Sequence, residues 1–148
     1  MIIGVLKEIK PNEYRVAAVP ATVTEIVRHG HTVYVESGAG LGSGYSDSDY
    51  QAAGAIIADT DTVWENADLF YKVKELFPQE FKWMNKDKIL FTYIHSNAPP
   101  AETDCLLDSH VSAVAYEDVP DKNGHFPLLP PMSELAGKGG FLAALHYM

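Results

Sequence analysis

The chain has 148 residues, the usual length of one domain and enough to bury a hydrophobic core. Its net charge of −9 argues against sequence-independent binding to nucleic acid or to an anionic membrane surface, so an anionic substrate would need a local cationic pocket. The single cysteine, Cys105, excludes an internal disulfide and a multi-cysteine metal site, which fits a reducing, cytoplasmic compartment. No apolar stretch reaches the roughly 18 residues of a membrane span.

Short apolar segments alternate with segments at helical spacing along the chain. The segments expected as strands are 2–6, 32–36, 55–58, 67–73, 88–94 and 111–115. The segments expected as helices run from Pro20 to a stop at Gly30, over 49–53, 61–66 and 78–84, and onward from Pro99 and Pro100. This alternation predicts an α/β fold, in which a parallel sheet carries helices on both faces as in Rossmann-like and flavodoxin-like domains.

Two polar clusters close two neighbouring strands of this expected sheet. Lys72 and Lys74 stand at the end of the first strand, and His95 follows the second. Ligands collect beyond the carboxyl ends of parallel strands, so Lys74 and His95 could converge on one small anionic ligand. Lysine supplies a fixed charge and histidine exchanges a proton near neutral pH, a pair that suits a carbonyl or carboxylate substrate. The alternative is a solvated strand end beside a histidine that only packs.

Arg15 lies between the first expected strand and the first expected helix. Its guanidinium could offer a planar, bidentate fork to a carboxylate. The alternative for this residue is an ion pair on the surface.

A glycine-rich stretch after the second strand resembles a dinucleotide-binding loop without matching its spacing. Counted from Gly38, the third glycine position of G-x-G-x-x-G holds Ser43, and counted from Gly40 it holds Tyr45. The residues that follow, 46–49, are typical of a loop and a helix cap. We assign these glycines to turn geometry, with a border to a ligand as the alternative.

The end of the chain predicts a helix that begins near two prolines, after a polar excursion over 118–126 with a turn at 121–124. Three glycines weaken this helix by roughly 1 kcal/mol each relative to alanine: Gly137, Gly139 and Gly140. The apolar run reaches Met148 without a stop signal. We therefore expect one domain over 1–130 and, over 131–148, the start of a linker helix that continues into another domain.

Several stretches together resemble the N-terminal part of the alanine dehydrogenase and pyridine nucleotide transhydrogenase family, and its alanine dehydrogenase members most closely. The matching stretches occur in the same order over essentially the whole chain, at 4–8, 13–17, 36–40, 72–75, 91–95 and 131–134. The transhydrogenase pattern lacks the residues that match Lys74 and His95. Their presence here favours 2-oxo acid chemistry.

The resemblance implies a role for each matching residue. By this resemblance, Arg15 and Lys74 hold the carboxylate and keto group of pyruvate, and His95 is the proton donor and acceptor. Met132 and Ser133 would lie by the nicotinamide of NAD, which is bound mainly by the domain expected after 148. The full-length enzyme, a homo-oligomer and by resemblance a hexamer, would interconvert L-alanine with pyruvate and ammonia, and the present chain alone would be inactive.

Three departures from the alanine dehydrogenase pattern leave alternatives open: Leu76 in place of a proline, and different residues over 96–100 and 137–140. The segment after His95 borders the expected pocket. One alternative is therefore an enzyme of the N5-(carboxyethyl)ornithine synthase type, which condenses pyruvate with an amino acid side chain. A second alternative is a non-catalytic module that binds a small carboxylate, or a subunit awaiting a partner chain.

Overall fold

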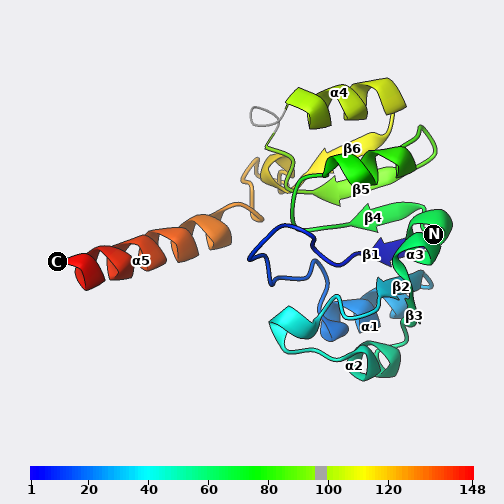
Figure 1. Ribbon diagram of the computed structural model, residues 1–148, viewed down its shortest axis with the longest axis horizontal. Helices are drawn as coiled ribbons and strands as arrows, with labels where there is room; N and C mark the ends of the chain where they lie inside the picture. Colours follow the sequence, from blue (N-terminus) through cyan, green and yellow to red (C-terminus); the bar gives the residue numbers. More distant parts are fainter. Residues whose placement is uncertain (96–99) are drawn as a thin grey trace. The chain divides into compact units, whose positions relative to one another are not determined.

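The computed structural model describes residues 1–95 and 100–148. Within these residues lies a six-stranded sheet made of β1 (Ile2–Val5), β2 (Thr32–Glu36), β3 (Ile56–Ala58), β4 (Leu69–Tyr71), β5 (Ile89–Thr92) and β6 (Ser112–Ala115). The strand order is β3-β2-β1-β4-β5-β6, and the pairs β3–β2, β2–β1, β1–β4 and β4–β5 run parallel (Figure 1). The predicted α/β fold is confirmed.

The helices begin at or within two residues of the starts expected from the sequence. They are α1 (Pro20–Arg28), α2 (Asp47–Ala52), α3 (Thr60–Asn66), α4 (Pro100–Ser109) and α5 (Pro130–Tyr147), with short 3-10 turns η1 (Leu41–Ser43), η2 (Pro78–Trp83) and η3 (Tyr116–Asp118). Ser46 and Asp49 form a capping box at α2, and the Asp59 side chain accepts a hydrogen bond from the Thr62 amide at α3. The segment expected as helical over 78–84 is a 3-10 turn.

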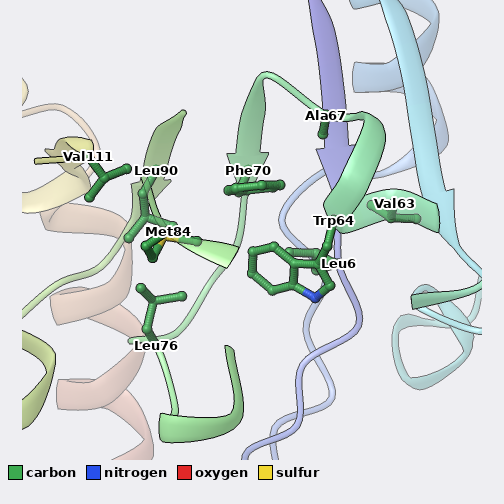
Figure 2. Packing of buried hydrophobic residues seen from close by; sticks show 9 residues of the cluster. All are labelled: Leu6, Val63, Trp64, Ala67, Phe70, Leu76, Met84, Leu90 and Val111. Atoms are coloured by element: carbon green, nitrogen blue, oxygen red, sulfur yellow. The ribbon is translucent and has the colours of Figure 1, made fainter. Parts of the chain in front are cut away.

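Side chains alternate along the strands between two hydrophobic clusters, one on each face of the sheet. Phe70 belongs to the first cluster, while the next residue, Tyr71, packs against the second. The first cluster takes Trp64 from α3 and is flanked by η2 and α4 (Figure 2). The second takes Val23 from α1 and Tyr50 from α2. Helices therefore cover both faces, and each fully buried aliphatic or aromatic side chain stabilises the fold by about 1.5–3 kcal/mol.

The two tryptophans of the chain lie together at the first cluster. The Trp64 and Trp83 rings stack in parallel, with centroids 6.3 Å apart and an interplanar angle of 1°. Trp64 is 2% exposed and also contacts the Phe70 ring at 4.4 Å. This aromatic group joins α3, η2 and β4 on one face of the sheet.

The chain divides into a first unit, 1–114, and a second unit, 115–148. The second unit contains η3, the predicted turn near Gly124, whose φ is +81°, and the helix α5. The helix runs unbroken through its three glycines and exposes several large apolar side chains: Leu135, Phe141, Leu142 and Leu145. Across the described residues, 1–95 and 100–148, no helix is both long and apolar enough to cross a membrane.

Candidate functional site

The strand order reverses direction between β1 and β4, at the centre of the sheet. Open α/β sheets bind ligands beyond the carboxyl ends of the strands at such a reversal. Lys7 and Glu8 follow β1 here, and Lys72 and Lys74 follow β4. The predicted lysines therefore lie at the point of the sheet where a ligand is expected.

The two lysines after β4 have different surroundings. The Lys72 side chain is completely buried, and its Nζ lies 2.7 Å from Glu80 Oε1 and 3.7 Å from Glu8 Oε2. The Lys74 side chain is 16% exposed, and its Nζ lies 3.4 Å from Glu75 Oε2. A buried ammonium requires close carboxylates, so Lys72 serves as an internal counter-ion. Lys74 is the lysine of the pair that solvent reaches.

The segment after β4, 73–77, has no regular structure and is held by buried polar side chains. The strand expected over 67–73 ends at Tyr71. The Lys72 amide still donates to the Phe91 carbonyl of β5 at 3.1 Å, but the next two amides donate to a carboxylate. Oε1 of Glu8 accepts from the amides of Val73 (2.6 Å) and Lys74 (3.3 Å). Oε1 of Glu102 accepts from Leu76 (2.7 Å), Oε2 of Glu80 accepts from Phe77 (2.8 Å), and the Thr92 hydroxyl donates to the Lys74 carbonyl (2.8 Å).

Burial raises the pKa of the Glu8 carboxyl above 4.5, although Lys72 and the two amide donors pull it down. Sequence reasoning missed the buried carboxylates that hold the segment after β4: Glu8, Glu80 and Glu102. The only signal was the position of Glu8 directly after the first strand, because its hydrogen-bond partners lie 65 and 66 residues further along the chain.

His95 follows β5, the strand beside β4. In this parallel pair Tyr71 aligns with Phe91, and the Tyr93 amide donates to the Val73 carbonyl. Lys74 and His95 therefore leave neighbouring strands one residue out of register. His95 has a φ of +50°, a left-handed conformation that costs a non-glycine residue on the order of 1–3 kcal/mol, and its ring stacks on Tyr93 at 5.8 Å.

Arg15 lies in the loop between β1 and α1 and forms a bidentate ion pair with Glu13. Its Nε donates to Glu13 Oε1 at 2.8 Å, and a terminal nitrogen donates to Oε2 at 2.6 Å. The hydrogen bond from Arg15 lowers the pKa of Glu13, to which Lys74 also contributes. Arg15 remains 47% exposed and lines a hollow of about 270 Å³ together with Lys7 and Glu8. The ion pair considered for this residue is present, and Glu13 engages one bidentate edge of the guanidinium.

The glycine-rich loop after β2 supports the segment that carries Arg15. A Cβ atom at Gly42 would lie 2.7 Å from the Tyr14 carbonyl oxygen, and the Ser43 hydroxyl donates to the same oxygen at 2.9 Å. A Cβ atom at Gly40 would lie 2.5 Å from the Tyr50 ring. These glycines serve close packing and turn geometry, in agreement with the assignment to turns.

Met132 and Ser133 lie in the first turn of α5, in the second unit. The Ser133 hydroxyl donates to the Leu129 carbonyl at 3.4 Å.

Of the predicted site residues in the first unit, Lys74 and His95 lie after adjacent strands, and Arg15 lies in the loop after β1. The segment 96–99, most of the stretch suspected of setting the second substrate, lies outside the described residues. Within the described ranges, no three His, Cys, Asp or Glu side chains gather as metal ligands.

Comparison with known proteins gives the same family from sequence and from structure. Residues 4–136 match the family model "Alanine dehydrogenase/PNT, N-terminal domain". The chain is 49% identical to alanine dehydrogenase of Mycolicibacterium smegmatis over 150 residues, which cover all of this chain and 40% of the relative. It is 50% identical to alanine dehydrogenase of Bacillus subtilis over 139 residues, which cover 93% of this chain and 36% of the relative.

Two solved structures share the fold. An L-alanine dehydrogenase superposes with a TM-score of 0.87 at 44% identity, covering 93% of this chain and 38% of its own. A transhydrogenase from Sinorhizobium meliloti superposes with a TM-score of 0.76 at 28% identity, covering 81% of this chain and 36% of the transhydrogenase chain. The chain thus spans about two fifths of the length of the curated relatives it matches. It belongs to the alanine dehydrogenase/PNT family and contains the N-terminal domain of that family.

Proposed function

We propose that the full-length protein is an NAD(H)-dependent alanine dehydrogenase, with residues 1–130 as its substrate domain and 131–148 as the start of the linker to an NAD-binding domain. The observation that carries the proposal is the pair Lys74 and His95, which leave the adjacent parallel strands β4 and β5, beside the point between β1 and β4 where the strand order reverses. Similarity to the alanine dehydrogenases over the whole chain supports this assignment.

The proposed reaction converts L-alanine, NAD⁺ and water to pyruvate, ammonium, NADH and a proton. Arg15 would hold the substrate carboxylate with its planar guanidinium, which orients the reacting carbon. Lys74 would stabilise negative charge on the oxygen of the keto group or carbinolamine. His95 would take the proton from that oxygen as the carbonyl forms, and return it in the reverse direction.

NAD supplies the hydride acceptor when it is bound. The first unit does not suit a dinucleotide pyrophosphate, because β1 is followed by a buried carboxylate, Glu8, instead of the glycine fingerprint. Met132 and Ser133 suit the nicotinamide end, since a thioether packs against a ring and a hydroxyl pairs with a carboxamide. We propose that these two residues border the nicotinamide and that the rest of the cofactor binds to the following domain.

The proposal extends to the setting of the enzyme. We propose a homo-oligomer, a hexamer as the family resemblance implies, in the reducing environment of the cytoplasm. Support for a reducing environment comes from Cys105, the single cysteine, which has no second cysteine in this sequence with which to form a disulfide.

The test is NADH oxidation by the full-length protein, with pyruvate plus ammonia compared with pyruvate plus ornithine or lysine. We expect turnover with ammonia. Turnover with the diamino acids alone would identify an enzyme of the N5-(carboxyethyl)ornithine synthase type, and pyruvate binding without turnover would identify a carboxylate-binding module. His95→Ala should lower turnover by about 10²–10⁴-fold. His110→Ala is the matched control, because His110 also has a positive φ (+55°) but precedes β6.

A further inference from the structure

We propose that Glu8 is a positioning residue for Lys74: its buried carboxylate fixes the backbone from which the Lys74 side chain reaches the substrate. This inference rests on the proposed role of Lys74 and deepens it. Glu8 follows β1 and Lys74 follows β4, so the contact spans the point where the strand order reverses.

The Glu8 carboxylate accepts hydrogen bonds from two consecutive backbone amides. Its side chain is 1% exposed, and Oε1 accepts from the amides of Val73 (2.6 Å) and Lys74 (3.3 Å). On the other side of the same residue, the Thr92 hydroxyl donates to the Lys74 carbonyl at 2.8 Å. The Lys74 peptide is thus held from β1 and from β5, although it belongs to no regular element.

The side chain of Lys74, in contrast, has an ion-pair partner from the same segment. Its described ion pair, to the neighbouring residue Glu75, measures 3.4 Å, and both side chains are 16% exposed. Because Glu75 belongs to the same segment, the backbone position of Lys74 and the direction of its Cα–Cβ bond decide where the ammonium can lie. Fixing the backbone is then the means by which the fold places this charge.

Glu8 is distinguished from Glu80 by the amides it holds. Both carboxylates contact the Lys72 ammonium, but Glu80 accepts from the Phe77 amide, three residues beyond Lys74. Removing either one leaves Lys72 with the other. Glu80 is therefore a matched control, with the same charge, burial and counter-ion but without contact to the Lys74 backbone.

The test is a double-mutant cycle in the full-length protein, measured as kcat/KM for pyruvate at saturating ammonia and NADH. Glu8→Ala should lower kcat/KM by about 10–100-fold, the effect of a misplacement near 1 Å. In a Lys74→Met background the same change should cost less than about twofold, because Glu8 acts through Lys74. Glu8→Gln retains an acceptor oxygen and should restore most of the activity, and Glu80→Ala should change kcat/KM by less than about threefold.

Equal losses from Glu8→Ala with and without Lys74 would overturn the positioning role and leave the proposed function intact. If Lys74→Met alone leaves kcat/KM unchanged, the proposed role of Lys74 falls, and that of Glu8 falls with it. Should Glu8→Ala fail to fold, Glu8→Asp enters the same cycle, since it keeps the charge beside Lys72 and shortens the reach toward the two amides by one carbon atom. Equal losses from Glu8→Asp with and without Lys74 would likewise overturn the proposal.

Discussion

Two loops at the carboxyl edge of the sheet support the residues of the proposed site in opposite ways. The segment 73–77, after β4, is held by three buried carboxylates and one buried lysine. The glycine-rich loop after β2 supports the Arg15 segment by close backbone packing, with Gly42 against Tyr14. Charge holds the first loop and the absence of side chains shapes the second. The first should therefore be sensitive to loss of a charge, and the second to gain of a single carbon atom.

The largest effect on stability is expected from Lys72→Met. This change removes the ammonium between Glu8 and Glu80 and leaves two carboxylates buried, which typically destabilises a protein by about 3–5 kcal/mol. The control Lys74→Met removes a partly exposed charge and should cost less than about 1 kcal/mol. Urea unfolding of the two variants measures the difference, and equal costs would show that burial does not distinguish the lysines.

A smaller effect is expected from Gly42→Ala. The added carbon atom would lie 2.7 Å from the Tyr14 carbonyl oxygen, so the Arg15 segment must shift, at a cost of about 1–3 kcal/mol. Pyruvate affinity should fall with it. Gly137→Ala is the matched control: its Cβ atom meets nothing within 4 Å, and the helix α5 should gain up to about 1 kcal/mol. Unchanged pyruvate affinity in Gly42→Ala would separate the glycine-rich loop from Arg15.

The smallest effect is the pH dependence of the Glu13–Arg15 pair. Arg15 holds the pKa of Glu13 below 4.5, so the pair contributes stability above pH 4.5 that is lost as pH falls through the lower folded value. The pair is partly exposed, so the contribution is at most about 1 kcal/mol. Between about pH 6 and pH 3, the free energy of unfolding should fall more steeply for the natural protein than for Glu13→Gln. The same pH dependence of the free energy of unfolding in the natural protein and in Glu13→Gln would contradict the pairing.

Buried Glu8 should show the opposite sign. Burial raises its pKa, so its contribution to stability is present below pH 4.5 and is lost as pH rises through the raised folded value. Replacement by glutamine removes this titration. The two carboxylates, five residues apart, thus respond to pH in opposite directions because one is desolvated and the other is paired with a partly exposed arginine.

Local signals in the sequence predicted the sheet, the helices on both faces and the two strands after which Lys74 and His95 lie. Helix starts at Pro20 and near Ser46 depend on residues within one turn, so the sequence displays them directly. The carboxylate support of 73–77 could not be predicted in this way. Its contacts join Glu8 to residues that lie 65 and 66 positions further along the chain. The sequence around a glutamate does not by itself show whether its side chain is buried or solvated.

Strand ends were the least predictable part of the sheet. The apolar run over 67–73 indicates a strand through Val73, but buried acceptors compete for the last amides and β4 ends at Tyr71. A similar limit applies to 78–84, whose apolar spacing fits a helix but whose backbone forms a 3-10 turn, where the Glu80 side chain bonds back to the Phe77 amide. In both places, a side-chain carboxylate decides the backbone hydrogen bonding.

The stacked tryptophans give this protein an optical probe confined to one side. Trp64 and Trp83 lie with parallel rings on the face that carries α3 and η2, and the opposite face has no tryptophan, because the chain contains two. Tryptophan fluorescence will therefore report the unfolding of the face of the sheet that carries α3 and η2, and of that face alone. Loosening of α1 or α2 would pass unnoticed by that emission, whereas the buried Tyr50, whose hydroxyl donates to the Ala18 carbonyl, would register it through tyrosine absorbance.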